Sequence, residues 1–173
     1  MNAKLFSRYA ILTALCAVLL VGVPLMAEDD DKGESKAEMA LKNRATPPKA
    51  AEMDANATIQ ALLEKKGPAD WSNKKGARLE GYVVQVEKED DGDVHLVLAA
   101  KPGETNTQSW VITEVPAALQ KKKSELSEKS LKSLVGQYVS VSGWLYREPD
   151  GEQGDPRGTL WEIHPVTEIK KLE

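Results

Sequence analysis

From residue 75 onward, apolar and polar residues alternate with a period of two, and this pattern constrains the fold more than any other feature of the chain. Such alternation is typical of strands that bury one face and expose the other. One helical stretch, at 116–136, interrupts it. The pattern predicts five strands, at 78–88, 94–100, 110–115, 137–146 and 159–169.

These segments follow the order strand, strand, strand, helix, strand, strand within residues 75–173. Gly81 lies inside the first strand, where a glycine often marks a bend or a bulge. The order predicts a mainly β protein with helices (α+β), built on a five-stranded OB-fold-like barrel. Its helix lies between strands 3 and 4, and an extra helix precedes the barrel. An open α+β sandwich is the alternative.

The first 27 residues have the pattern of a secretory signal peptide. Lys4 and Arg8 precede an almost wholly apolar run at 9–23, and Ala27 is a small residue before an acidic stretch. The apolar run is shorter than the roughly 20 residues of a membrane span, so cleavage is favoured over an uncleaved anchor. We therefore expect a periplasmic or secreted protein, which contacts a membrane only if the signal stays uncleaved.

The composition of the chain excludes several classes of protein. Its one cysteine, Cys16, lies within the signal, so neither an internal disulfide nor a Cys-rich zinc module is expected. Cleavage leaves 146 residues and changes the formal charge from −4 to −6, because two cations and no acid are removed. This negative charge makes a general nucleic-acid coat a poor candidate.

Between the signal and the barrel we expect two segments. Residues 28–54 are polar, with few bulky apolar side chains, and are predicted to form a disordered tether. Residues 55–74 are predicted to form a short helix and a loop, with Asp54 or Asn56 as the cap, and with Ile59 and Leu62 on one helix face. We expect this helix and Trp71 to lean on the barrel.

Two strings of residues give the chain a family resemblance. GDVHLVL covers 92–98 and LWEIHPV covers 160–166, with further similarity at 110–116 and 135–145. In these strings the chain resembles a family of small exported bacterial proteins that have an OB-like domain and no established function. The resemblance implies a fold and a compartment, but no activity.

The two histidines of the chain, His95 and His164, both lie in these strings. Each has an acid two residues away, Asp93 and Glu162, and on a strand such pairs share a face. With Glu114 at the end of the third strand, this set could bind a divalent metal or serve acid–base chemistry. Alternatively, each carboxylate only orients its imidazole. The structural interpretation is favoured because no dense ligand motif such as His-Glu-x-x-His is present. Whether the two histidines converge stays open.

A second candidate site is an aromatic strip on the fourth strand. Tyr138, Trp144 and Tyr146 share the face opposite Val139 and Val141, and an exposed strip of this kind stacks on bases or sugars. Packing beneath the N-terminal helix or the loop at 147–158 is favoured instead, since the net charge opposes a polyanion.

The function that the sequence predicts is an exported, non-catalytic binding module. Its ligand would lie on the barrel face or between the turn at 90–93 and the loop at 147–158, where OB-folds bind. A small molecule, a cation or a protein partner is favoured over nucleic acid. No cofactor is predicted, although a divalent metal stays open as an alternative. No catalytic residue is assigned. Two alternatives remain: nucleic-acid binding through the aromatic strip, and a metal-dependent, nuclease-like hydrolase that uses His95, His164, Glu114 and Glu162.

Overall fold

A computed structural model describes residues 35–64, 71–148 and 157–173, all of which belong to one compact unit. The predicted signal at 1–27 and most of the loop at 147–158 lie outside these residues, as does the first part of the tether. Within the described part of the chain, every helix is too short or too polar to span a membrane.

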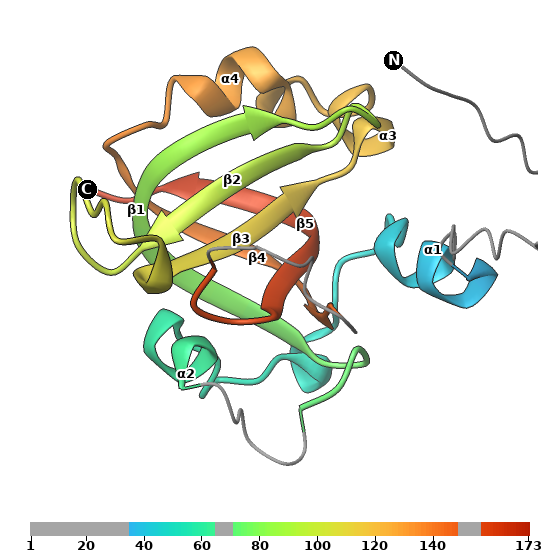
Figure 1. The fold of residues 1–173 in the computed structure, drawn as a ribbon. Coiled ribbons are helices and arrows are strands. Elements are labelled where there is room, and N and C mark those ends of the chain that lie inside the picture. The colour runs from blue at the N-terminus through green and yellow to red at the C-terminus, as the bar shows by residue number, and fades with distance from the viewer. Residues whose placement is uncertain (1–34, 65–70, 149–156) are drawn as a thin grey trace, which may run out of the picture. The chain divides into compact units, whose positions relative to one another are not determined.

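Five strands form a closed barrel in the order β1-β2-β3-β5-β4 (Figure 1). The strands are β1 (Gly76–Lys88), β2 (Val94–Ala99), β3 (Trp110–Val115), β4 (Tyr138–Arg147) and β5 (Trp161–Lys171). All neighbours pair antiparallel except β3 and β5, which close the barrel in parallel. The predicted OB-fold is therefore confirmed, and the open sandwich is wrong.

The barrel interior is filled by the apolar residues of the alternating pattern. In β2, Leu96 and Leu98 point inward, while His95, which directly precedes Leu96, points outward. The inward side chains of the other strands include Leu79, Val111, Val141 and Ile163, and all are fully buried. Each such side chain contributes about 1.5–3 kcal/mol by its removal from water.

Gly81 serves a different purpose from the predicted bend. The irregularity in β1 lies farther along, between Val83 and Gln85. A Cβ on Gly81 would lie 2.9 Å from the carbonyl oxygen of Ala99 and would also meet the side chain of Ile59. The glycine therefore allows close packing against the segment before the barrel. The pairing of β4 with β5 is also irregular, because its register shifts on both sides of Gly143.

Short helices occupy the two ends of the barrel (Figure 1). Between β3 and β4 lie α3 (Ala117–Gln120), the 3-10 turn η3 (Ser124–Leu126) and α4 (Glu128–Lys132). The Ser127 hydroxyl caps α4 by accepting from the backbone N–H of Ser130, and Leu131 packs into the core. Gly136, with φ of +81°, turns the chain into β4.

The helix before the barrel begins later in the chain than predicted. It is α2 (Ile59–Leu63), and its cap is Thr58 rather than Asp54 or Asn56. Ile59 and Leu62 join the barrel core, and Trp71 packs edge-on against Trp161 with ring centroids 5.5 Å apart. The expected contact of this segment with the barrel is thus present.

The predicted disordered tether is wrong for residues 35–54. This segment forms α1 (Lys36–Lys42) and the 3-10 turn η1 (Ala50–Glu52) and then contacts the barrel. The Arg44 guanidinium stacks on the Trp144 ring at 4.1 Å from its centroid, and the Trp144 indole N–H donates to the carbonyl of Thr46 at 2.8 Å. The segment has too few apolar residues for a core of its own, but the barrel supplies the surface that orders it.

Replacement of Arg44 by alanine tests this docking. Arg44→Ala removes the stacking on Trp144 and a 2.7 Å hydrogen bond to the carbonyl of Asn73. We expect the free energy of unfolding, measured with urea, to fall by about 1–2 kcal/mol. Lys36→Ala, on the exposed side of α1, is the control and should change little. If the two variants were equally stable, residues 35–54 would not be docked on the barrel through Arg44, and the predicted tether would stand.

Candidate functional site

Strand pairing places three sequence-distant segments side by side on the outer face of the barrel. His95 of β2 and Glu114 of β3 are direct register partners. The parallel pair between β3 and β5 joins Thr113 to Ile163, which both face the interior. The next side chains, Glu114 on β3 and Glu162 and His164 on β5, therefore meet on the outside.

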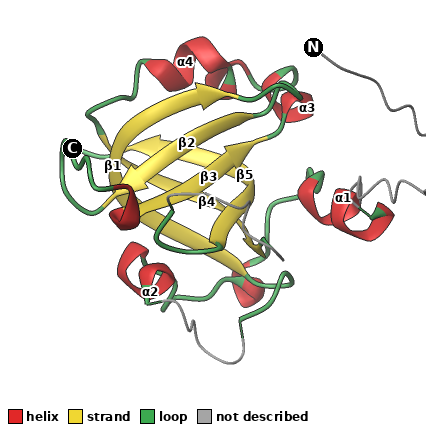
Figure 2. Cartoon of the chain, viewed as in Figure 1, coloured by secondary structure: helices red, strands yellow, loops and turns green. Residues whose placement is uncertain are grey.

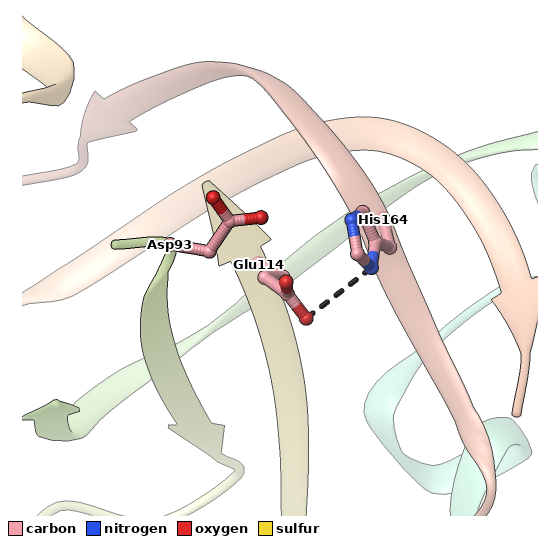
Figure 3. A group of neighbouring side chains, drawn as sticks. All are labelled: Asp93, Glu114 and His164. Atoms are coloured by element: carbon pink, nitrogen blue, oxygen red, sulfur yellow. Dashed lines mark ion pairs between the residues drawn. The ribbon is translucent and has the colours of Figure 1, made fainter. Parts of the chain in front are cut away.

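Glu114 is the centre of this group. Its Oε2 lies 3.1 Å from His95 Nε2 and 3.2 Å from His164 Nδ1 (Figure 3 draws the second contact). The same His164 nitrogen lies 3.2 Å from Oε1 of Glu162. The two histidines, whose convergence the sequence left open, thus share one carboxylate oxygen.

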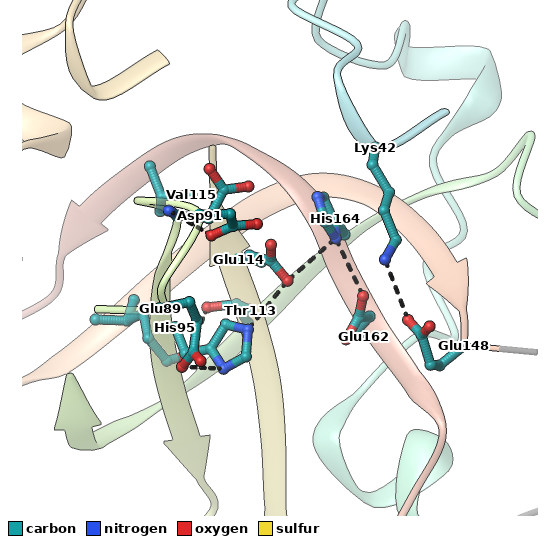
Figure 4. A network of polar contacts seen from close by, with 12 residues as sticks. Lys42, Glu89, Asp91, His95, Thr113, Glu114, Val115, Glu148, Glu162 and His164 are labelled. Atoms are coloured by element: carbon teal, nitrogen blue, oxygen red, sulfur yellow. Dashed lines mark hydrogen bonds and ion pairs between the residues drawn. The ribbon is translucent and has the colours of Figure 1, made fainter. Parts of the chain in front are cut away.

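Further charges extend the group in both directions (Figure 4). Glu89 lies 3.1 Å from Nδ1 of His95, and the guanidinium of Arg157 lies 3.1 Å from Oε2 of Glu162. Asp93 accepts from the backbone N–H of Ala117 at 2.7 Å. We call this set the polar cluster: Glu89, Asp93, His95, Glu114, Arg157, Glu162 and His164. All five site residues predicted from the sequence belong to it.

Most of the polar cluster is shielded from solvent. The side chains of His164 and Glu162 are each 3% exposed, and that of Glu114 is 11% exposed. His95 is more accessible, at 27%. The cluster therefore has a buried end on β5 and an open end at β2, beside the turn that follows β1.

Burial and charge pairing oppose each other in setting the pKa values. Burial lowers the pKa of His164, but its contacts with Glu114 and Glu162 outweigh this and raise it to about 9. The pKa of His95 is likewise raised, with burial opposed by Glu114. Burial raises the pKa of Glu114, yet both histidines hold it well below its ordinary value. At neutral pH His164 is a cation and Glu114 is an anion.

Asp93 is the exception among the carboxyl groups. Burial, followed by the nearby charges of Asp91 and Glu114, raises its pKa to about 6, against the lowering effect of the Ala117 N–H. One oxygen of Asp93, one of Glu114 and one nitrogen of His164 all lie within 4.8 Å of one another. Among the described residues, these three could hold a metal ion.

Sequence reasoning missed Glu89 and Arg157. Glu89 follows β1 and reaches His95 only because the turn at 89–93 folds β2 back on β1. The charge alternation across this hairpin could have indicated it. Arg157 has no local signal, since it precedes Glu162 by five residues outside any regular element.

The aromatic strip is not an exposed stacking surface. Trp144 is 8% exposed beneath Arg44, and Tyr146 is 1% exposed. Lys42 Nζ lies 5.2 Å from the centroid of the Tyr146 ring, and the His164 ring lies edge-on to Tyr146 with the two centroids 5.7 Å apart. Tyr138 packs instead against Tyr82. Trp144 and Tyr146 are therefore packed, but beneath residues 42–46 rather than beneath the predicted helix or the loop at 147–158, and the strip as a platform for bases is wrong.

No family model matches this chain, and no curated protein matches it. Among solved structures it is similar to a chain of the S. pombe Stn1–Ten1 complex (11% identity, TM-score 0.37, 57% of this chain and 58% of that chain). It is also similar to OBody AM3L09 bound to hen egg-white lysozyme (15% identity, TM-score 0.42, 69% of this chain and 96% of that chain). A third similar structure is Entamoeba histolytica asparaginyl-tRNA synthetase (17% identity, TM-score 0.39, 60% of this chain and 22% of that chain). This chain thus spans less than two thirds of the first and third chains. The fold assignment follows from the strand order of the barrel itself.

The ion pairs of the polar cluster can be measured through the titration of the histidine rings. In metal-free protein we expect the His164 ring to titrate near its pKa of about 9 in proton NMR, against an ordinary value of 6.5. A raised pKa means that the stabilisation is complete below pH 6.5 and is lost as pH rises through 9. The loss is on the order of 3 kcal/mol.

Glu114→Gln tests the source of this pKa. We expect the variant to lose about 3–5 kcal/mol of stability, because both histidines lose their shared anionic partner. In the variant, the pKa of His164 should fall by at least about 1. Glu168→Gln, an exposed acid on the same strand, is the control. An unchanged His164 titration in Glu114→Gln would contradict the assignment.

Proposed function

We propose that this protein is an exported, non-catalytic OB-fold binding module that takes its ligand on the outer face of β2, β3 and β5. One observation carries the proposal: charged side chains from all three strands converge and are largely buried there, on Glu114. Acids spread over a solvated barrel surface would make no such contacts.

The energetics support a functional origin for the polar cluster. Buried ion pairs are weak contributors to stability, since desolvation offsets most of the attraction, and apolar residues of similar size often serve as well. The barrel already has an apolar interior, with Leu96, Val111 and Ile163 fully buried. A stable fold therefore does not require His164 and Glu162 to be charged and buried.

The place of the polar cluster also supports binding. OB-folds take ligands on the face of strands 2 and 3 and on the loops that join strands 1 to 2 and 4 to 5. His95 and Glu114 lie on that face, Asp93 belongs to the first loop, and Arg157 to the second. In Figure 2, no helix of the described chain crosses in front of β2 and β3.

The charges indicate the class of ligand. The polar cluster holds four carboxyl groups against two imidazoles and one guanidinium, and the predicted mature chain carries −6. A polyanion is therefore disfavoured. A cation, a small molecule or a protein partner with a basic group fits better.

A metal-dependent hydrolase is the second candidate function. The observation that favours it is the convergence of His95 and His164 on Glu114. Hydrolysis of bis(p-nitrophenyl) phosphate in the presence of Mn²⁺, lost in Glu114→Gln, would support it over a non-catalytic module.

Export is tested by expressing the complete sequence with a C-terminal tag in a Gram-negative host. We expect the product in the periplasmic fraction, with a mass that lacks residues 1–27. Lys4→Glu combined with Arg8→Glu should reduce export, because a positive n-region is required. Product of full mass in the membrane fraction would identify an uncleaved anchor.

Binding is tested by NMR on the purified protein with four probes: zinc chloride, single-stranded oligothymidylate, a neutral oligosaccharide and a basic peptide. We expect one of them to shift the signals of His95, Glu114 and His164, and the shift to weaken in Glu114→Gln. We expect no shift from oligothymidylate. Perturbations confined to α4, or none with any probe, would sink the proposal.

A further inference from the structure

Three side chains on the outer face present metal-ligating atoms to one another (Figure 3). Asp93 directly precedes β2, Glu114 lies in β3, and His164 lies in β5. Two carboxylate oxygens and one imidazole nitrogen, one from each residue, all lie within 4.8 Å of one another. The set is thus built from three strands that pair only in the folded barrel.

The spacing of these atoms fits a shared ion. In a tetrahedral zinc site with bonds of about 2.0–2.1 Å, neighbouring ligand atoms lie about 3.3 Å apart. Oε2 of Glu114 lies 3.2 Å from His164 Nδ1 and 3.1 Å from His95 Nε2. A ligating oxygen of Asp93 lies within 4.8 Å of a ligating atom of Glu114 and of His164, so Asp93 is the third potential ligand of an ion bound there.

The charges around Asp93 also call for a cation. Its carboxyl group faces that of Glu114, and like charges so close are unfavourable in a partly buried place. The guanidinium of the polar cluster, that of Arg157, contacts Glu162. A divalent ion between Asp93 and Glu114 converts this repulsion into attraction.

We propose that Asp93, Glu114 and His164 bind a divalent transition-metal ion of the Zn²⁺ or Mn²⁺ class, with His95 beside the remaining coordination position. The inference rests on the proposed function and names its ligand class. A set of carboxylates and imidazole without thiolate suits these ions.

Neighbouring groups hold the ligands in place. The backbone N–H of Ala117 donates to Asp93 Oδ1 at 2.7 Å and fixes the direction of that carboxyl group. Such an outer contact is a usual means by which a protein orients a metal ligand. Glu162, held by Arg157, lies 3.2 Å from the same Nδ1 of His164 that faces Glu114, so it stands beside the ion as a further carboxylate. A bound ion would tie the start of β2, the end of β3 and the middle of β5 together.

The test uses protein expressed from the complete sequence and purified through a tag that binds no metal, without chelator. We expect about one equivalent of metal by mass spectrometry, and Co²⁺ added to stripped protein should give the visible absorption of a low-symmetry site. In calorimetric titrations Zn²⁺ should bind, with Ca²⁺ and Mg²⁺ much weaker. Asp93→Asn, Glu114→Gln and His164→Gln should each weaken Zn²⁺ binding by more than about 100-fold.

Two variants separate a metal site from an ion-pair network. Asp93→Asn removes a repelled carboxylate, so the metal-free variant should fold at least as well as the parent and yet lose Zn²⁺ binding. Glu168→Gln removes an exposed acid of β5 outside the polar cluster and should keep binding within about threefold. No bound metal, or Zn²⁺ binding retained in Asp93→Asn, would overturn the inference. If metals fail while the oligosaccharide or the peptide shifts the His164 signal, the inference fails and the proposed function stands.

Discussion

The parallel contact between β3 and β5 is the constraint on which the candidate site depends. It closes the barrel, and the register of Thr113 with Ile163 sets Glu114 beside His164 and Glu162. The antiparallel register of β2 with β3 brings His95 to the same carboxylate. If either register slipped by one residue, the histidines would point into the apolar interior and the leucines into solvent. Core packing and site geometry are therefore specified by the same pairings.

Charge alternation explains how so many ionisable groups can share this face. Along the polar cluster, acid and base follow each other from Glu89 through His95, Glu114, His164 and Glu162 to Arg157. Each buried charge has an opposite neighbour, which offsets the cost of its desolvation. Asp93 breaks the alternation because its carboxyl group faces that of Glu114. A cation added there would therefore relieve a like-charge repulsion.

The outer surface of the barrel has a covered face on β4 and an accessible face on β2 and β3. On β4, the segment at 44–46 covers Trp144, and Lys42 of α1 lies over Tyr146. On β2 and β3, the described part of the chain leaves the open end of the polar cluster accessible at His95. The N-terminal segment thus shields the aromatic face and leaves the polar face as the candidate binding surface.

Local pattern was enough to determine the strands, the helical connection and the face on which each histidine lies. Glu162 and His164 could be paired from sequence because residues two apart on a strand share a side. The convergence of His95 with His164 could not, because it depends on two pairing registers between segments far apart in the chain. For the same reason local pattern does not predict the contact of Arg157 with Glu162, and it predicts a tether where residues 35–54 are ordered. Their order comes from contacts such as Thr46 with Trp144, separated by 98 residues. Periodicity reports which face of a strand is buried, while only the closed barrel decides which outer side chains meet.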